Sequence, residues 1–375
     1  MGTEDTDRQG MEKDLEVMRV IIAGGGTGGH VYPGLAVAKE IVRRNSQAEV
    51  LFIGTEKGLE SRVIPPEGFR LETITVSGIK GVRGLRRLGS LFKIPVSVWE
   101  SFRIISQFEP RLVIGVGGYS SGPPVLVAAL LRIPILLQEQ NATPGLTNRL
   151  LAKFAGLVAT SFPESQNFFG KKAVLTGNPV RREFSQSKAS VSEGRFVVVI
   201  MGGSQGARAI NQAVIQSLDY LKPEFPRLKF IHQTGESGFD EVSGAYARYA
   251  LDHEVRPYFY DMPTQYLRAD LLVSRAGATT LAEIALSGKG AILIPFPYAT
   301  DNHQQKNAES FANAGAAEMI LQNTLSGKIL ADRIQFYMNH PEELRQMAEK
   351  SLSFGRPDAT ERIVDLAMAL AAKVA

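Results

Sequence analysis

A glycine-rich run at residues 24–30 carries the clearest chemical signal in this 375-residue chain. It reads Gly-Gly-Gly-Thr-Gly-Gly-His, follows the apolar run 20–23 and precedes a helical pattern over residues 33–41. This order predicts a buried strand, a tight turn and the start of a helix. Glycines let the backbone approach a ligand closely, and a helix N-terminus offers unpaired N–H groups to an anion. The run therefore predicts a site for a phosphate-bearing ligand.

His30 ends this glycine run, at the predicted start of the helix. An imidazole changes protonation near neutral pH, so His30 is a candidate general base. A neutral histidine that caps the helix is the ordinary alternative for a lone residue of this type. The other histidines show no metal-ligand spacing and the chain has no cysteine, so no metal site is predicted.

The same run can be spelled G-x-G-x-x-G with Gly24, Gly26 and Gly29, which is the fingerprint of dinucleotide-binding enzymes. The acid expected after the next strand can only be Glu56. The spelling alone is weak evidence. A nicotinamide or flavin enzyme is therefore a minor alternative, and no cofactor is predicted.

The second half of the chain repeats the plan of the first. An apolar run at residues 196–201 leads into a glycine-rich run at 202–207 and then into a helical pattern. Further on, Glu283 lies on a helix that follows another glycine turn; its carboxylate suits the two hydroxyls of a ribose, or is simply exposed to solvent. The polar run 301–307 contains Gln304 and offers amides to a sugar, unless it is an ordinary surface loop.

Strand and helix patterns alternate from residue 18 onward, which predicts parallel strands joined by crossover helices. We expect an α/β protein with two doubly wound domains, since the chain is too long for one ordinary core. A change of composition places the boundary so that residues 18–180 form one domain and residues 181–357 the other. A final helix is expected at about 358–375, packing back on the first domain. Residues 1–17, rich in acids, are expected to be a disordered extension.

The charge of the chain favours an anionic partner. The formal net charge is +4, and about +8 without the acidic extension. The longest apolar stretch, residues 125–137, is too short to cross a bilayer and contains Arg132.

Residues 79–103 combine six basic residues with large apolar ones. This mixture fits a surface that rests on anionic lipid, where each base adds about 1 kcal/mol. A core-facing helix with a basic outer face is the alternative. Nucleic acid is not expected, because no aromatic platform or groove-reading helix accompanies the bases. The candidate membrane residues are Ile79, Lys80, Leu85, Arg86, Leu88, Phe92 and Trp99.

Four motifs in matching order, at residues 24–30, 115–119, 202–207 and 274–277, closely resemble the MurG family of glycosyltransferase family 28. Members of that family are bacterial UDP-N-acetylglucosamine:lipid I N-acetylglucosaminyltransferases of peptidoglycan synthesis. The resemblance implies a GT-B fold, in which two Rossmann-like domains face each other across a cleft. It also implies inverting transfer of N-acetylglucosamine to the C4 hydroxyl of the N-acetylmuramyl unit of lipid I, giving β-1,4-linked lipid II and UDP.

The resemblance also assigns residues to each substrate. The acceptor diphosphate would meet glycine turns that include Gly26, Gly117, Gly118 and Tyr119. His30 would be the base. The remaining substrate contacts would be Thr27, Gly28, Gly29, Asn141, Arg181, Ser204, Phe259, Ala278, Thr279, Thr280, Leu281, Ala282, Glu283 and Gln304. Helix N-termini and Ser204 would stabilise the departing diphosphate, so a bound metal is not required.

One departure from the family pattern concerns the sugar: His303 stands where a second glutamine is expected. Two alternatives remain open. One is a GT-B enzyme with another lipid acceptor, such as a diacylglycerol sugar transferase, and the other is a nucleotide-sugar-binding scaffold without turnover. The partners implied by the resemblance are UDP-N-acetylglucosamine, lipid I and an anionic inner-leaflet surface. The implied location is peripheral, on the cytoplasmic face of the bacterial plasma membrane.

Overall fold

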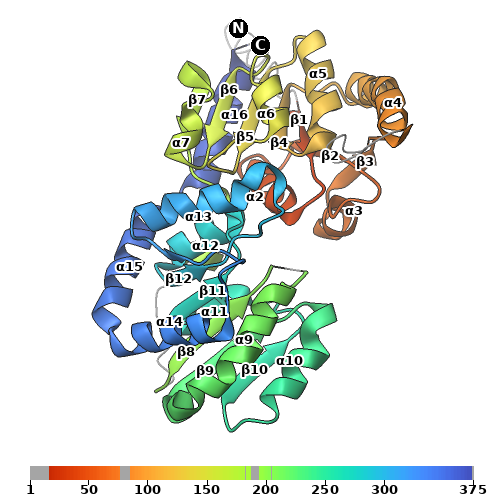
Figure 1. Ribbon diagram of the computed structural model, residues 1–375. Coiled ribbons are helices and arrows are strands. Elements are labelled where there is room, and N and C mark those ends of the chain that lie inside the picture. Colours follow the sequence, from red (N-terminus) through yellow and green to blue (C-terminus); the bar gives the residue numbers. More distant parts are fainter. Residues whose placement is uncertain (1–16, 77–84, 182, 187–193, 204, 374–375) are drawn as a thin grey trace, which may run out of the picture.

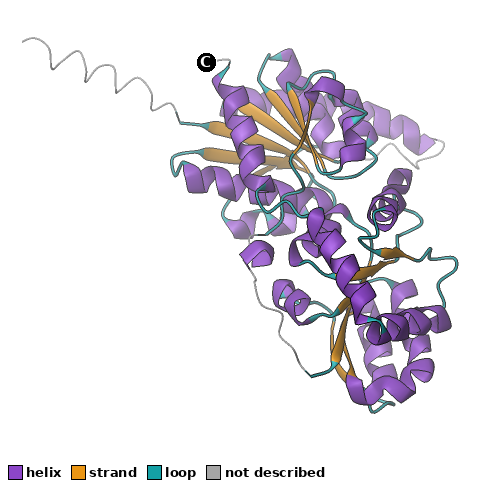
Figure 2. Ribbon diagram, turned by 90° about the vertical axis from the view of Figure 1, so that its left-hand side faces the viewer, coloured by secondary structure: helices purple, strands orange, loops and turns teal. Residues whose placement is uncertain are grey.

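The computed structural model describes residues 17–76, 85–181, 183–186, 194–203 and 205–373, with the backbone alone at 85–93, 185 and 186. It contains two parallel β-sheets, each flanked by helices and lying one above the other in Figure 1. Figure 2 shows each sheet enclosed between helices on its two faces. Residues 1–16 of the predicted extension, Ile79, Lys80 and Ser204 lie outside the described residues.

The first sheet has seven strands within the described part of the chain, in the order β3-β2-β1-β4-β5-β6-β7. Helices cover both faces, so the strands read as continuous apolar runs; residues 20–23, for example, are fully buried. The strands are β1 (Arg19–Gly24), β2 (Glu49–Gly54), β3 (Arg70–Thr73), β4 (Leu112–Gly117), β5 (Ile135–Glu139), β6 (Leu157–Thr160) and β7 (Ala173–Leu175).

The helices around this sheet follow the strands in the alternation that the sequence predicts. They are α2 (Gly28–Arg44), α3 (Glu60–Val63), α4 (Leu85–Phe108), α5 (Gly122–Leu130), α6 (Leu146–Leu151) and α7 (Pro163–Gln166), and α8 (Glu183–Gln186) follows β7. Helix α2 begins after Thr27, which has extended backbone angles, and ends with Arg43 and Arg44. Bases in a last turn interact favourably with the partial negative charge of the helix C-terminus.

The second sheet has six strands among the described residues, in the order β10-β9-β8-β11-β12-β13. Its strands are β8 (Phe196–Met201), β9 (Leu228–Gln233), β10 (Asp252–Arg256), β11 (Leu271–Ser274), β12 (Gly290–Leu293) and β13 (Glu318–Met319). Its helices are α9 (Arg208–Leu221), α10 (Phe239–Tyr246), α11 (Met262–Arg268), α12 (Ala278–Ser287), α13 (His303–Asn313), α14 (Gly327–Asn339) and α15 (Pro341–Ser353).

In both sheets the strand order reverses beside the first strand. β1 pairs with β2 on one side and β4 on the other, and β8 pairs likewise with β9 and β11. Ligands of doubly wound sheets bind outside the carboxyl ends of the strands at such a switch point. The glycine turns predicted from the sequence follow β1, β4, β8 and β11, so they lie at these two points.

The last helix, α16 (Ala359–Ala372), crosses back to the first sheet, where it lies beside β6 in Figure 1. Ile363, Val364 and Ala367 are fully buried in one apolar cluster with residues of β1, β2, β4 and α2. Arg44 of α2 also forms an ion pair with Asp365 of α16. The chain therefore passes between the two sheets twice. The domain boundary at residue 180 stays a prediction.

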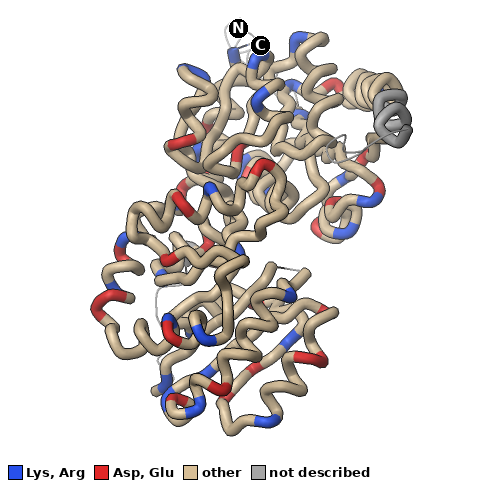
Figure 3. The backbone as a smooth tube through the Cα atoms, in the orientation of Figure 1, with Lys and Arg blue, Asp and Glu red and all other residues tan. Residues whose placement is uncertain are grey.

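The outer helices of the second sheet carry acids and bases side by side (Figure 3). On α15, for example, Arg345 lies 2.7 Å from Glu342 and 3.1 Å from Glu349. Within the described residues, no helix is long and apolar enough to span a bilayer.

Candidate active site

The two glycine turns of the first sheet touch each other at its switch point. A Cβ atom on Gly118 would lie 2.7 Å from the Gly25 carbonyl oxygen, and one on Gly24 would lie 2.5 Å from the Gly117 carbonyl oxygen. Real Cβ atoms do not approach backbone so closely, so this contact requires glycine. The predicted residues Gly26, Gly117, Gly118 and Tyr119 are thereby brought together, with the Tyr119 side chain 43% exposed.

A carboxylate supports the first of these turns from beneath. Glu60 of α3 is 1% exposed and accepts a hydrogen bond of 2.7 Å from the Gly26 N–H. The Gly26 N–H is therefore already occupied by Glu60. Gly28 and Gly29 begin α2, where N–H groups precede the first helical hydrogen bonds. The start of α2 therefore offers N–H groups that Glu60 does not occupy.

His30 lies on the first turn of α2 and faces the second glycine turn. A Cβ atom on Gly117 would lie 3.2 Å from the His30 Nε2 atom, and the Thr27 Oγ1 atom lies 3.2 Å from Nδ1. The pKa of His30 is lowered to about 4, chiefly by burial and also by the charge on His303 of α13, whereas the Gly25 carbonyl and Glu60 act in the opposite direction. The imidazole is therefore neutral at pH 7, as a general base requires.

Asn141 follows β5 and is held by a buried carboxylate. Glu139 is 1% exposed and accepts hydrogen bonds from the Asn141 backbone N–H (2.9 Å) and side-chain amide (3.2 Å), and from Asn148 (2.9 Å) and Gly145 (3.2 Å). Burial raises the pKa of Glu139, while these donors lower it. The loop that carries Asn141 is thereby fixed in place.

Asn307 of α13 joins this loop to the second sheet. It is fully buried, accepts a hydrogen bond from the Ala142 N–H (2.9 Å) and donates to the Asn141 side-chain oxygen (3.1 Å). Its amide also donates to the Ala276 carbonyl, just before α12 (3.3 Å). The side chain of Asn141 therefore links the two domains, and its amide oxygen has a protein partner.

Glu283 lies on α12 within a group of polar side chains from both domains. The hydroxyl of the buried Tyr266 donates to it at 3.4 Å. Burial raises the pKa of Glu283 to about 7, against the charge of Arg181 and the Tyr266 hydrogen bond. Burial raises the pKa of Tyr32 of α2, on which the charges of Arg181 and Glu283 also act in opposite directions. Tyr32 shares a hydrogen bond with Tyr258. The predicted pair of Arg181 and Glu283 is thus brought together, and the alternative of a fully exposed Glu283 is wrong.

The other donor-side candidates surround this group. Thr279 accepts a long hydrogen bond from Asn178 (3.4 Å), while Leu281 is fully buried and can offer only its backbone to a ligand. The Phe259 N–H donates to Gln233 (3.0 Å), and Gln304 accepts from the Phe296 N–H (3.0 Å). Ala278, Thr280 and Ala282 share the first turns of α12 with Thr279.

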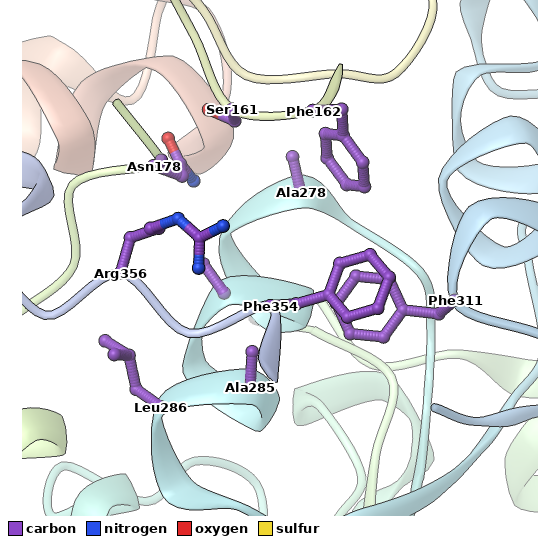
Figure 4. A pocket seen from close by; sticks show the side chains of 11 residues that line it. Ser161, Phe162, Asn178, Ala278, Ala285, Leu286, Phe311, Phe354 and Arg356 are labelled. Carbon is purple, nitrogen blue, oxygen red and sulfur yellow. The ribbon is translucent and has the colours of Figure 1, made fainter. Parts of the chain in front are cut away.

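A pocket lies on another side of α12, against the two segments that connect the domains (Figure 4). It encloses about 370 Å³, including space open to solvent. Its walls are Ser161, Phe162, Gly177, Asn178, Ala278, Ala282, Ala285, Leu286, Phe311, Phe354 and Arg356. Because Ala278 and Ala282 line this pocket, α12 presents different sides to the pocket and to the Glu283 group.

Large apolar side chains are exposed on α4 and at the end of α5, which packs against α4. We call these residues the α4–α5 surface: Ile94, Val96, Trp99, Phe102, Leu130 and Leu131. Trp99 is 61% exposed, and the Arg103 guanidinium lies 5.5 Å from the centre of its ring. Leu85, Arg86, Leu88 and Phe92 lie earlier on α4, in the part described by backbone alone. Of the predicted membrane residues, only the Trp99 side chain is placed.

Sequence reasoning missed four residues that hold the site together: Tyr32, Glu60, Glu139 and Asn307. Three of them stand in or beside the predicted motifs: Tyr32 follows His30 by two residues, Glu139 precedes Asn141 by two, and Asn307 ends the polar run 301–307. A single acid after a strand, such as Glu60, carries no pattern that distinguishes it from a surface residue. Among the described residues, no group of three or more acidic or histidine side chains is arranged to hold a metal ion.

Comparison with known proteins assigns the chain to a family. Residues 20–160 match the glycosyltransferase family 28 N-terminal domain and residues 197–363 the corresponding C-terminal domain. The chain belongs to glycosyltransferase family 28. This family 28 chain is 46% identical over 357 residues to the UDP-N-acetylglucosamine--N-acetylmuramyl-(pentapeptide) pyrophosphoryl-undecaprenol N-acetylglucosamine transferase of Myxococcus xanthus, covering 94% of the chain and 93% of that relative. The namesake of Thermodesulfovibrio yellowstonii is 45% identical, with 94% and 99% covered.

Solved structures agree with this assignment. The family 28 chain is similar to the crystal structure of Acinetobacter baumannii MurG, with a TM-score of 0.78 and 33% identity over 94% of this chain and 99% of that one. A UDP-GlcNAc 2-epimerase from Neisseria meningitidis shares the fold at a TM-score of 0.65, with 13% identity over 94% and 99% of the two chains. The predicted GT-B fold and the predicted MurG resemblance are confirmed. The chain is a glycosyltransferase, and the nicotinamide or flavin alternative is excluded.

The family 28 chain also has a buried histidine behind the glycine turn that follows β8. His232 of β9 is fully buried between the Tyr246 hydroxyl (2.9 Å from Nδ1) and the Asn211 side-chain oxygen (3.1 Å from Nε2). Asn211 in turn donates to the Thr234 carbonyl (3.0 Å), beside the turn. Burial lowers the pKa of His232 to about 3.

We expect the free energy of unfolding to depend less on pH between about 3 and 6.5 in His232→Gln than in the wild type. The unfolded chain binds a proton at His232 near pH 6.5 and the folded chain only near pH 3, so stability is lost as pH falls between these values. The slope from this residue reaches about 1.4 kcal/mol per pH unit. Urea unfolding, followed by circular dichroism at pH 4.5, 5.5, 6.5 and 7.5, measures this pH dependence of the free energy of unfolding. The control is His340→Gln, which changes an exposed histidine. Equal slopes in wild type and His232→Gln would contradict this account.

Proposed function

We propose that this enzyme transfers N-acetylglucosamine from UDP-N-acetylglucosamine to the C4 hydroxyl of the N-acetylmuramyl unit of lipid I. The products are β-1,4-linked lipid II and UDP. The observation that carries the proposal is the match to relatives named for this reaction, at 43–46% identity over nearly their whole length. These names favour lipid I over the diacylglycerol acceptor that the sequence left open.

The acceptor belongs to the first domain in this proposal. Its diphosphate meets the start of α2 and the turn after β4, where N–H groups and the positive end of the helix favour an anion. The C4 oxygen attacks C1 of the donor sugar as the bond from C1 to the diphosphate breaks, which inverts C1. His30 takes the hydroxyl proton, and the bonding electrons leave with UDP. Neutral His30 can accept a proton in this step at pH 7.

The donor belongs to the second domain. Glu283 accepts hydrogen bonds from the ribose hydroxyls, and Arg181 contacts the nucleotide beside it. The uracil meets the backbone near Phe259, and the diphosphate meets Ser204 and the first turn of α12, formed by Ala278, Thr279, Thr280, Leu281 and Ala282. Gln304 contacts the sugar, and Thr27, Gly28, Gly29 and Asn141 approach it from the first domain. Charge on the departing diphosphate is stabilised by helix N-termini.

The enzyme meets the membrane through the α4–α5 surface in this proposal. Exposed Trp99, Phe102 and Leu130 provide apolar area, and Arg103 adds a positive charge. Such a mixture binds the boundary between head groups and acyl chains of an anionic bilayer. The enzyme would then be peripheral, on the cytoplasmic leaflet that holds lipid I.

The experiment that tests the function measures transfer of labelled N-acetylglucosamine from its UDP conjugate to a short-chain lipid I analogue, with EDTA present. Lipid II analogue and an equal amount of UDP are the expected products. A diacylglycerol acceptor in a parallel reaction tests the other lipid acceptor. UDP binding without transfer to either acceptor would contradict the proposed function and favour the alternative of a nucleotide-sugar-binding scaffold without turnover.

We expect His30→Ala to lower kcat by about 100-fold or more, because the C4 hydroxyl loses its proton acceptor. In the wild type, the acid limb of kcat/KM should fall near pH 4, the pKa of His30 in the free enzyme, and not near 6.5. Steady-state kinetics from pH 4 to 8 measure both quantities, with His340→Ala as the matched control. A kcat within twofold of wild type would remove His30 from this role.

We expect UDP affinity to increase as pH rises from 6 to 8. The ribose hydroxyls donate to the ionised form of Glu283, which forms as pH passes about 7, so ionisation and binding support each other. The dissociation constant should fall by up to about tenfold over this range. Calorimetry measures the dissociation constant at each pH. The Glu283→Gln variant shows the part of the pH dependence that comes from protonation of the UDP phosphate and not from Glu283. The same pH dependence in both proteins would contradict the assignment of Glu283.

We expect the double variant Trp99→Glu/Phe102→Glu to bind phosphatidylglycerol vesicles at least tenfold more weakly than wild type, since the apolar contact is lost and two negative charges face an anionic surface. Co-sedimentation measures binding. Tyr220→Glu, at a half-exposed aromatic residue of the second domain, is the matched control. Undiminished binding of the double variant, or equal loss in the control, would place the membrane contact elsewhere.

A further inference from the structure

Glu60 is a buried acid, 1% exposed, beneath the proposed acceptor site. Besides the Gly26 N–H at 2.7 Å, its carboxylate accepts the Thr55 backbone N–H at 2.8 Å and the Thr55 hydroxyl at 2.9 Å. Burying a carboxylate is costly unless hydrogen bonds compensate, and here three donors from two segments do so. An apolar side chain would fill this space without that cost, so simple packing does not account for an acid here.

Three glycines make room for this carboxylate. A Cβ atom on Gly25 would lie 2.4 Å from the Glu60 Cδ atom, and one on Gly54 would lie 2.5 Å from Cγ. A Cβ atom on Gly58 would lie 2.2 Å from both carboxylate oxygens. The turn after β1, the end of β2 and the segment before α3 therefore close around one functional group. This explains part of the glycine content of these segments without any ligand.

The turn that Glu60 supports is the one on which the chemistry depends. Residues 25–27 lie between the end of β1 and the start of α2, where no regular ladder fixes the backbone. The Gly26 N–H bond to Glu60 ties this turn to Thr55 of the neighbouring strand end. His30 follows on the first turn of α2, so its place relative to Gly117 depends on how the turn is held.

We propose that Glu60 is a positioning residue for the transfer reaction. It holds the turn after β1 so that the start of α2 and His30 face the turn after β4. The inference rests on the proposed function for its kinetic consequences, although the role in holding the turn does not. Glu60 touches neither substrate. Its negative charge also favours the protonated form of His30, which maintains some basicity in a buried imidazole.

The test replaces Glu60 with Gln. This keeps the size of the side chain but replaces one carboxylate oxygen, which accepts hydrogen bonds, with an NH2 group, which cannot accept them. We expect kcat with the lipid I analogue to fall at least tenfold and the dissociation constant of UDP to change less than twofold. The acid limb of kcat/KM should move to lower pH, because a negative charge near His30 is lost. A merely structural defect would lower kcat and UDP binding capacity together and leave the limb in place. Glu67→Gln, an exposed acid nearby, is the matched control.

A second measurement needs no turnover. Amide hydrogen exchange of Gly26 and Thr55 should become at least tenfold faster in Glu60→Gln, while the amides of β8 should not change. If the wild type transfers no sugar, the proposed function fails, yet this exchange still decides whether Glu60 holds the turn. Unchanged exchange, or a kcat within threefold of wild type, would overturn the proposal.

A pair of variants covers the case in which Glu60→Gln does not fold. Gly58→Ala places a methyl group against the carboxylate, so we expect it to lower kcat at least tenfold in the wild type. In the Glu60→Ala background the methyl group meets empty space, and Gly58→Ala should lower kcat less than twofold further. Equal effects in the two backgrounds would show that Gly58 does not accommodate Glu60.

Discussion

The close contact between two glycine turns is the constraint on which the proposed acceptor site depends. Gly118 approaches the Gly25 carbonyl and Gly24 approaches the Gly117 carbonyl, at distances that exclude a side chain. This contact is possible because β1 and β4 are neighbours in the sheet, although their last residues, Gly24 and Gly117, are 93 positions apart in the chain. Parallel strands end at the same edge, so the turns that follow them meet. His30 lies where the two turns meet, and Glu60 supports one of them from beneath.

The two domains are joined by buried amides near the same edge. Asn307 bonds to the loop of Asn141 and to the carbonyl before α12, so a single side chain connects the proposed acceptor side with the helix proposed for the donor diphosphate. A buried amide that loses a partner costs about 1–3 kcal/mol, which favours one relative placement of the domains. The aromatic pair Tyr32 and Tyr258 adds a contact from α2 to the donor side.

Removal of water sets the charge states of the site. Burial disfavours the charged form of each group, so it lowers the pKa of His30 and raises the pKa of Glu283. An uncharged base and a carboxyl that ionises near neutral pH add little negative charge to a region proposed to receive two diphosphates. The helix starts of α2 and α12 can then act on these anions with little opposition.

The sequence by itself determined the fold class, because apolar runs of strand length, glycine turns and helical periodicity are local properties. It also predicted the enzyme family, because several motifs recur in one order, and the placement of glycine turns at strand ends. The precise domain boundary and the roles of single residues stay predictions. Only the tertiary structure decided that Gly26 donates to Glu60, that Asn141 is tied to Asn307, and that Glu283 is half-buried beside Arg181. These contacts join residues 34, 166 and about 100 positions apart, and no local pattern encodes which distant side chain a folded chain brings to a turn.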